Sequence, residues 1–120
     1  MEKPLALVIE DDPDLAMVFT EAVKGAGYCV ETFHTGTQGL ARLKEIIPRL
    51  VVLDLHLPGV SGLEINQYLR HDLRLEGVHV IIASADDRLA ETADSATLVL
   101  LKPVSLVQLR DLSKRLISGD

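Results

Sequence analysis

The sequence predicts a doubly wound α/β fold, in which a parallel sheet of five strands is covered by helices on both faces. Two observations support this prediction. Short apolar runs alternate along the chain with longer segments whose apolar residues recur at helical spacing. Such strict alternation of strand and helix is typical of βα units, which build parallel sheets. The length of 120 residues fits one domain, and the apolar fraction of 48% is enough for one core.

Five short runs have the composition of buried strands. The first, at residues 5–9, reads Leu-Ala-Leu-Val-Ile, and a continuous apolar run suits a parallel strand that is covered on both faces. The second run is also predicted to be a strand, but its β-forming residues alternate only roughly with polar ones. The predicted strands cover residues 5–9, 28–33, 50–53, 78–83 and 98–101.

The segments between the strands carry helical periodicity. In the first, Pro13 suits the first turn of a helix, while Gly25 and Gly27 end it. We favour Asp12 as the cap of this helix. The predicted helices cover residues 13–26, 37–47, 63–75 and 106–117. The polar segment from Asp86 to Ser95 is predicted to form only a brief helix between the last two strands.

Composition excludes several classes of protein. The formal net charge of −6 and the aromatic content of 3% argue against direct nucleic-acid binding by this chain. A single cysteine, Cys29, excludes an internal disulfide framework, and we expect it to be a small core residue on its strand. No apolar run approaches the ~18 residues of a membrane span. The first residues lack the pattern of a secretory signal, so a cytoplasmic protein without membrane contact is expected.

Polar residues follow four of the five predicted strands. The first strand is followed by Glu10, Asp11 and Asp12, and the third by Asp54. The fourth strand is followed by Ser84, and the fifth by Lys102 and Pro103. In an open parallel sheet, ligands bind beyond the carboxyl ends of the strands. If the strand order is 2-1-3-4-5, these four strand ends are neighbours and their polar residues converge on one cleft.

The chemistry of such a cleft is specific. Carboxylates packed together repel one another, and a divalent cation removes that conflict. Because the candidate ligands are all hard oxygens, Mg²⁺ is favoured, with Mn²⁺ as an alternative. Asp54 can then act as a carboxylate nucleophile toward phosphorus. The side chains of Lys102 and Ser84 can share the charge of the phosphoryl oxygens. The resulting acyl phosphate hydrolyses readily, which suits a mark that must be reset.

Four segments together resemble the receiver domain of a two-component response regulator. They are LVIEDDPDL for the acidic pocket, VVLDLHLPGVSG for the phosphoacceptor region, VIIASA for the hydroxyl residue and LKP for the lysine. Each segment is weak evidence alone, but all four occur in order and at the appropriate strand ends. The resemblance covers essentially the whole chain. It implies a flavodoxin-like (βα)5 fold with strand order 2-1-3-4-5, present here as one receiver domain over residues 1–120 with no output domain in this chain.

The resemblance also implies a set of metal ligands. Asp54 is then the residue that accepts the phosphoryl group, from a sensor histidine kinase or a histidine phosphotransfer protein. Glu10 and Asp11 hold Mg²⁺ together with Asp54 and the backbone carbonyl of His56. Gly62 opens the helix that follows the phosphoacceptor loop.

Further roles follow from the same resemblance. Ser84 and Lys102 contact the phosphoryl group, and the Lys102–Pro103 peptide bond is expected to be cis. His56 and Asp86 occupy the two variable positions that flank the phosphorylation site in receivers. We expect them to tune dephosphorylation by blocking or orienting the attacking water. The other histidines, at positions 34, 71 and 79, are expected at the surface or at strand edges.

The sequence departs from the family pattern in two places. Many receivers carry Tyr or Phe three residues before the lysine, and that aromatic side chain swings inward on phosphorylation. Val99 stands there in this chain, and an aliphatic side chain cannot report by the same rotamer change. The segment from Ser84 to Lys102 is also about one helical turn shorter than is usual. We therefore expect a shortened fourth helix.

The prediction is a signalling switch that assists its own phosphorylation and dephosphorylation and thereby changes binding to an unidentified output protein or domain. Two alternatives remain open. Val99 and the shortened segment are compatible with an interaction module whose output no longer depends on phosphorylation. The second alternative is an enzyme on a related sheet. An aspartyl-phosphate hydrolase is disfavoured because His56 replaces the second Asp of an Asp-x-Asp loop, and a flavin protein because the acidic residues 10–12 would repel the flavin phosphate.

Overall fold

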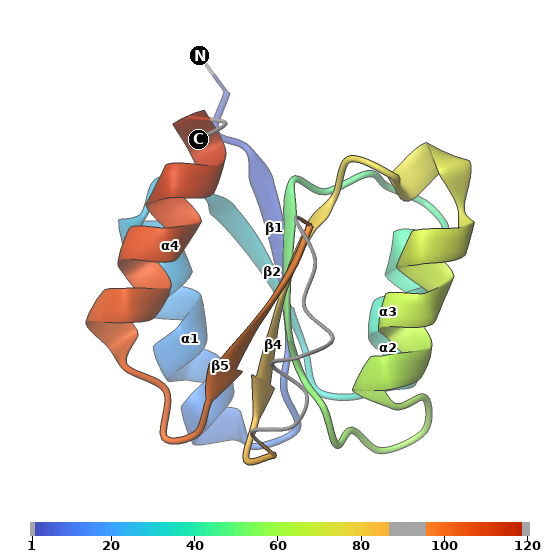
Figure 1. Cartoon of the computed structure of the whole chain (residues 1–120), viewed down its shortest axis with the longest axis horizontal. Helices are drawn as coiled ribbons and strands as arrows, with labels where there is room; N and C mark the ends of the chain where they lie inside the picture. Colours follow the sequence, from blue (N-terminus) through green and yellow to red (C-terminus); the bar gives the residue numbers. More distant parts are fainter. Residues whose placement is uncertain (1, 87–95, 119–120) are drawn as a thin grey trace.

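A computed structural model describes residues 2–86 and 96–118 (Figure 1). The elements in chain order are β1 (Leu5–Ile9), α1 (Pro13–Gly25), β2 (Cys29–Phe33), α2 (Gly36–Leu43), β3 (Leu50–Asp54), α3 (Gly62–His71), the short 3-10 helix η1 (Leu73–Leu75), β4 (His79–Ser84), β5 (Thr97–Leu101) and α4 (Leu106–Ser118). The strands form one parallel sheet in the order β2-β1-β3-β4-β5. The predicted strand order is therefore confirmed. The brief helix predicted between Asp86 and Ser95 falls on residues 87–95, outside those that the structure describes.

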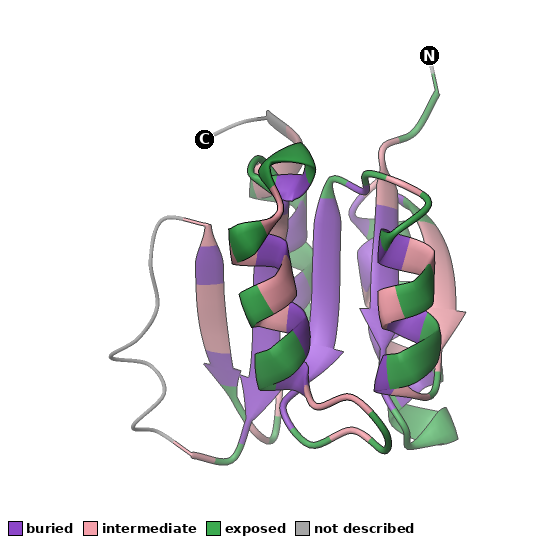
Figure 2. Cartoon of the chain, turned by 90° about the vertical axis from the view of Figure 1, so that its right-hand side faces the viewer, coloured by how far each residue is buried: buried purple, intermediate pink, exposed green. Residues whose placement is uncertain are grey.

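Helices cover both faces of the sheet. Figure 1 shows α1 and α4 packed side by side on one face and α2 and α3 on the other. Each face has its own apolar core, and β1 contributes to both, because successive side chains of a strand point to opposite faces. Ala6 and Val8 belong to the core under α1 and α4, whereas Leu7 and Ile9 belong to the core under α2 and α3. The central strands are almost fully buried (Figure 2), since every residue of β3 is buried and so are all but the first residue of β1 and β4. Among the described residues, no helix is long and apolar enough to cross a bilayer.

The prediction that Cys29 is a core residue was wrong, because its side chain is exposed. Cys29 begins β2, which lies at the edge of the sheet next to β1 alone. An edge strand is covered less completely than a central one, and β2 contains no fully buried residue. Cys29 is therefore exposed as the first residue of this edge strand, whereas the later residues of β2 are half-buried.

Two helices end earlier than their periodicity predicts. α2 ends at Leu43 rather than at residue 47, and the Arg74 guanidinium donates hydrogen bonds to the carbonyls of Leu43 and Ile46. These bonds satisfy acceptors that helix termination leaves without partners. α3 ends at His71, because Asp72 adopts an extended conformation and caps η1. The outcome is that Ile47 is exposed, as is Leu73, which is 85% accessible.

The final helix is fastened to the sheet by two polar contacts. The buried Tyr28 hydroxyl donates to the carbonyl of Ser113 at 2.6 Å. The Arg49 guanidinium donates to the carbonyls of Leu116 and Ile117 in the last turn of α4. Burial raises the pKa of Tyr28 to about 12, so the hydroxyl remains a donor over the whole physiological range. Residues from the first half of the chain thus fix the position of its last helix.

Replacing Tyr28 by Phe tests this contact. The Tyr28→Phe variant should lose about 1 kcal/mol of unfolding free energy, the usual net value of one such hydrogen bond. Urea denaturation would measure the loss. Tyr68→Phe is the matched control, since Tyr68 is only half-buried, and it should change the unfolding free energy by less than about 0.5 kcal/mol. Equal stability of Tyr28→Phe and the unsubstituted protein would contradict the role of the contact.

Candidate functional site

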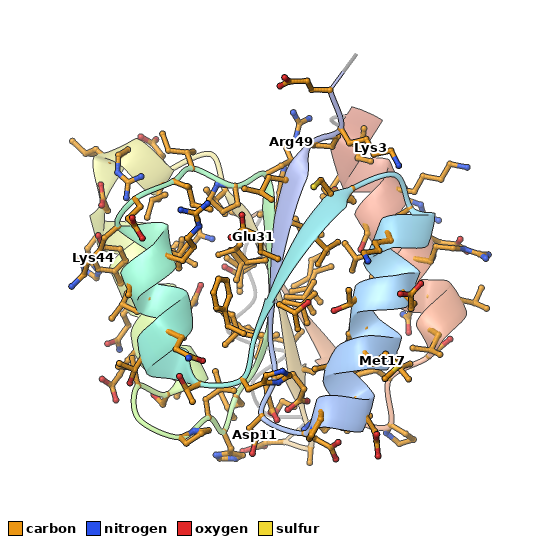
Figure 3. All side chains as sticks on the ribbon, turned by 180° about the vertical axis from the view of Figure 1, so that it is seen from behind. Lys3, Asp11, Met17, Glu31, Lys44 and Arg49 are labelled. Atoms are coloured by element: carbon orange, nitrogen blue, oxygen red, sulfur yellow. The ribbon has the colours of Figure 1, made fainter. Side chains whose placement is uncertain are left out.

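The predicted polar side chains converge at the carboxyl edge of the sheet. Asp54 ends β3 and is 5% exposed, and Ser84 ends β4 and is 1% exposed. Glu10 directly follows β1 and Lys102 directly follows β5. Figure 3 shows Asp11 at this edge, with Lys3 and Arg49 at the opposite end of the molecule. The strand order therefore brings together side chains that lie far apart in the sequence.

Asp54 and Lys102 form an ion pair at this edge of the sheet. The Lys102 Nζ lies 3.0 Å from the Asp54 Oδ2, and the other carboxylate oxygen, Oδ1, accepts the backbone N–H of His56 at 3.3 Å. The Lys102 backbone N–H donates to the carbonyl of Ser84 at 2.8 Å, which extends the pairing of β4 and β5 by one residue. The peptide bond between Lys102 and Pro103 is cis. The ammonium group is thus held against the carboxylate by the sheet itself.

Three carboxylates meet at the same place. One oxygen each from Glu10, Asp11 and Asp54 can be chosen so that all three lie within 4.8 Å of one another. Glu10 is only 1% exposed, and its Oε1 has no hydrogen-bond partner among the described residues. Burial, followed by the neighbouring Asp11, raises the pKa of Glu10 to about 7. A buried carboxylate oxygen without a partner, beside two more carboxylates, fits a divalent cation with hard oxygen ligands.

The backbone beside this cluster is also anchored. The carboxylate of Asp12 accepts the backbone N–H groups of Asp14 and Leu15, so Asp12 is the N-cap of α1, as predicted. The Asp12 backbone N–H donates to the Glu10 Oε2 at 3.3 Å. The acidic loop therefore starts a helix whose N-terminus favours negative charge.

The Ser84 hydroxyl is oriented by the turn that follows it. Its Oγ accepts the backbone N–H of Asp86 at 2.9 Å. Because that bond uses a lone pair of the oxygen, the hydroxyl hydrogen can be donated to another acceptor. Asp86 is half-buried at this turn, and the His56 side chain is exposed on the loop after β3. The backbone carbonyl of His56 stays a predicted metal ligand.

Gly62 is required by the close approach of α3 to the end of β3. A Cβ atom at this position would lie 2.3 Å from the backbone oxygen of Asp54 and 2.9 Å from the Cα of Leu55. The Gly62 backbone N–H also donates to the carbonyl of Leu55 at 2.9 Å. Gly62 begins α3, as predicted, and it allows the helix to support the backbone that carries Asp54.

Sequence reasoning missed one residue that contacts the acidic loop. The Nδ1 of His34 lies 3.0 Å from the backbone carbonyl of Glu10. His34 is exposed, as predicted, but the prediction gave it no contact with the site. A bond from a side chain to a distant backbone carbonyl leaves no spacing pattern in the sequence, so only the fold reveals it.

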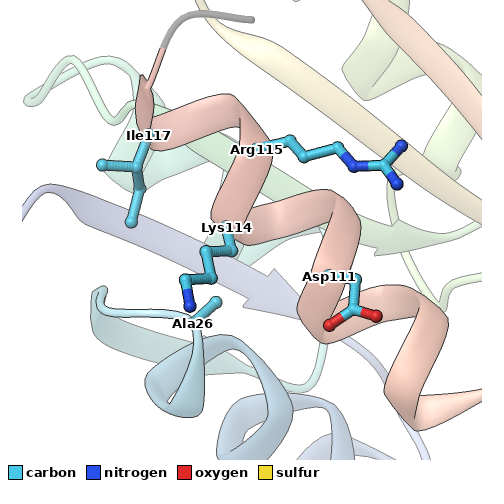
Figure 4. Close-up of a pocket in the computed structure, with 5 residues that line it drawn as sticks. All are labelled: Ala26, Asp111, Lys114, Arg115 and Ile117. Atoms are coloured by element: carbon cyan, nitrogen blue, oxygen red, sulfur yellow. The ribbon is translucent and has the colours of Figure 1, made fainter.

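A separate surface cavity lies away from these residues. Its volume is about 560 Å³, and it occupies the junction between the end of α1 and the C-terminal half of α4 (Figure 4). Its lining residues are Ala26, Asp111, Lys114, Arg115 and Ile117. None of them lies among the polar residues at the carboxyl edge of the sheet, so this cavity is not the predicted phosphorylation site.

Comparison with known proteins agrees with the geometry. The family model for the response regulator receiver domain matches residues 6–114. The DNA-binding response regulator MtrA of Mycolicibacterium smegmatis is 38% identical over 79 residues, which cover 66% of this chain and 33% of that protein. The phosphate regulon transcriptional regulatory protein PhoB of Rhizobium meliloti is 32% identical over 110 residues, covering 88% of this chain and 48% of PhoB. The chain thus spans half or less of the length of these relatives.

Solved structures share the whole fold. The receiver domain of the Francisella response regulator 1452 superposes with a TM-score of 0.86 at 24% identity, covering 97% of this chain and 98% of that one. A structure described as a transiently phosphorylated "switch" in bacterial signal transduction has a TM-score of 0.79 at 28% identity, covering 99% of this chain and 98% of that one. These likenesses cover the sheet and the helices on both of its faces.

The raised pKa of Glu10 predicts a specific pH dependence. In the unfolded chain Glu10 titrates near its ordinary value of 4.5, and in the metal-free fold it titrates at about 7. The folded state therefore binds more protons than the unfolded state between these values, so Glu10 lowers stability progressively as pH rises from 4.5 to 7. Urea denaturation with a chelator present should show this loss in the unsubstituted protein but not in Glu10→Gln. Identical pH profiles for the two proteins would contradict the prediction.

Proposed function

The chain belongs to the family of response regulator receiver domains, and we propose that it is a switch controlled by phosphorylation of Asp54. The observation that carries this proposal is the placement of one buried carboxylate, Asp54, against both a lysine ammonium group and two further carboxylates. The phosphoryl donor is a sensor histidine kinase or a histidine phosphotransfer protein. Phosphorylation then changes binding to an output protein or domain.

The transfer uses groups at the carboxyl edge of the sheet. A carboxylate oxygen of Asp54 attacks phosphorus, and the phosphorus–nitrogen bond of the donor phosphohistidine breaks, leaving its electron pair on the imidazole nitrogen. Glu10, Asp11, Asp54 and the backbone carbonyl of His56 would hold Mg²⁺, with Mn²⁺ as an alternative. The bound cation supplies positive charge that offsets the carboxylates and the phosphoryl oxygens.

Lys102 and Ser84 contribute from the two neighbouring strands. In the unphosphorylated protein Lys102 is paired with the Asp54 carboxylate. Once that carboxylate carries the phosphoryl group, the ammonium group can pair with a phosphoryl oxygen instead. The Ser84 hydroxyl, already fixed by the Asp86 backbone N–H, can donate to another phosphoryl oxygen. Movement of these two groups would carry the change into β4 and β5.

Resetting the switch requires attack of water on phosphorus, which breaks the bond to the Asp54 oxygen and releases inorganic phosphate. His56 and Asp86 lie on the loops that follow β3 and β4, a position that supports our proposal that they flank the path of that water. Their side chains would set the lifetime of the phosphorylated state by blocking or orienting the water. The protein thus assists its own dephosphorylation without acting on a separate substrate.

One observation favours a second candidate function, an interaction module whose output does not depend on phosphorylation. Val99 lies on β5 opposite Ile82 and packs against the core under α2 and α3. A half-buried β-branched side chain has few alternative rotamers and cannot swing between an inward and an outward position as an aromatic ring can. If the chain is such a phosphorylation-independent module, partner binding would be equal for the unsubstituted protein and for Asp54→Ala.

Incubation with acetyl phosphate and Mg²⁺ tests the phosphoryl chemistry. Intact-mass spectrometry should detect one added phosphoryl group that is stable to acid and labile to base, as expected of an acyl phosphate. The adduct should be absent from Asp54→Asn and from samples treated with a chelator. Lys102→Ala should accumulate less adduct, because the ammonium group that offsets the phosphoryl charge has been removed. Absence of an adduct, together with failure to bind beryllofluoride, would contradict the proposed switch.

The lifetime of the acyl phosphate tests His56 and Asp86. Replacing either residue by Ala should change the dephosphorylation rate by on the order of tenfold, since each acts on the attacking water. The decay of the adduct mass with time gives the rate. His71→Ala is the control, because His71 is an exposed histidine at the far end of α3. An unchanged lifetime in both site variants would remove their proposed role.

A further inference from the structure

The acidic loop remains attached to the edge strand after β1 has ended. β1 ends at Ile9, yet the backbone N–H of Glu10 donates to the carbonyl of Phe33 at 2.9 Å. In a parallel ladder, the next bond would run from the backbone N–H two residues further along β2 to the carbonyl of Glu10. That donor would be Thr35. The described hydrogen bonds include no such bond, because Thr35 has already become the N-cap of α2.

The imidazole of His34 takes the place of the missing donor. Its Nδ1 lies 3.0 Å from the carbonyl oxygen of Glu10. A carbonyl can only accept a hydrogen bond, so Nδ1 must carry the hydrogen. The side chain thus continues the β1–β2 ladder by one bond while the backbone turns away into α2. This bond fixes the main chain between Glu10 and Asp11, the two residues of the acidic loop that belong to the carboxylate cluster.

The same turn also contacts the loop that follows Asp54. The backbone N–H of Gly36 donates to the carbonyl of Pro58 at 3.2 Å, and a Cβ atom at Gly36 would lie 1.7 Å from the carbonyl oxygen of Val60. Residues 34–36 therefore contact both the acidic loop and the loop that follows Asp54.

We propose that His34 is a positioning residue for the divalent cation, acting through its hydrogen bond to the carbonyl of Glu10. Carboxylates that lie close together repel one another, so they must be held in place by the backbone before a cation arrives. A cation binds less tightly when outer contacts that orient its ligands are removed. This inference rests on the proposed function, since it assumes that Glu10, Asp11 and Asp54 hold the cation.

Three variants separate the hydrogen bond from the bulk of the side chain. His34→Phe keeps a flat ring but has no donor. His34→Asn keeps an N–H at nearly the position of Nδ1. His71→Phe removes a bond of the same chemical type, from the Nδ1 of His71 to the carbonyl of Gln67 at 2.7 Å, at the far end of α3. Because both histidines are exposed, none of these changes removes core packing.

Isothermal titration calorimetry with Mg²⁺ alone gives the affinity of each folded protein, and it suits a chain that contains no Trp to report binding by fluorescence. His34→Phe should bind Mg²⁺ roughly tenfold more weakly, the lower end of the range for outer contacts of metal ligands. His34→Asn should recover most of the affinity, and His71→Phe should bind as the unsubstituted protein does. Thermal unfolding of the metal-free proteins shows separately whether stability has changed.

Two results would overturn the inference, and they are distinguishable. If the unsubstituted protein binds Mg²⁺ and His34→Phe binds it equally well, His34 has no positioning role while the proposed function stands. If the unsubstituted protein does not bind Mg²⁺, the proposed metal chemistry fails and the inference falls with it. A loss of thermal stability in His34→Phe with unchanged Mg²⁺ affinity belongs to the first result, because it shows a structural contact only.

Discussion

Repulsion among the three carboxylates at the carboxyl edge of the sheet is the constraint on which the rest of the site depends. Glu10, Asp11 and Asp54 offer oxygens within 4.8 Å of one another. Two of these residues are almost fully buried, so water screens their charges poorly. Within residues 2–86 and 96–118, Lys102 is the cation that forms an ion pair with the cluster, and its partner there is Asp54. Burial, and after it the neighbouring carboxylates, raise the pKa of Glu10, and a bound divalent cation would favour its charged form.

The fold resists this repulsion with backbone contacts. The main chain of Glu10 is bonded to the end of β2 on both its N–H and its carbonyl side. Asp54 remains within β3, and the pairing with β4 continues beyond it through the bond from Leu55 to Ala83. Gly62 brings α3 directly against the same strand end. Glu10 and Asp54 are therefore carried by backbone that packing and sheet hydrogen bonds hold in place, so these two carboxylates are positioned before a ligand binds.

Two kinds of feature could be predicted from the sequence: strands and helices, whose apolar residues recur at regular spacing, and polar residues that lie at the ends of the strands. Apolar runs and helical spacing predicted the strands, and the resemblance to receiver domains predicted their order. The position of Asp54 at the end of its strand predicted the edge of the sheet where it lies. The errors concern contacts between distant segments. Arg74 binds carbonyls at and beyond the early end of α2. The edge position of β2 leaves Cys29 exposed, and His34 reaches Glu10 through its side chain. These outcomes depend on tertiary neighbours, which local periodicity does not encode.

The connection between the site and the rest of the molecule runs along β4 and β5. Ser84 and Lys102 end neighbouring strands, and the Lys102 backbone N–H is bonded to the carbonyl of Ser84. Val99 lies three residues before Lys102 and pairs with Ile82, two residues before Ser84. A shift of either strand end toward a phosphoryl group would therefore reach Val99 through paired backbone. Because the valine side chain has little rotamer freedom of its own, it would move with the strand. If the proposed switch operates, its readout would therefore depend on displacement of β5 as a unit rather than on rotation of one side chain.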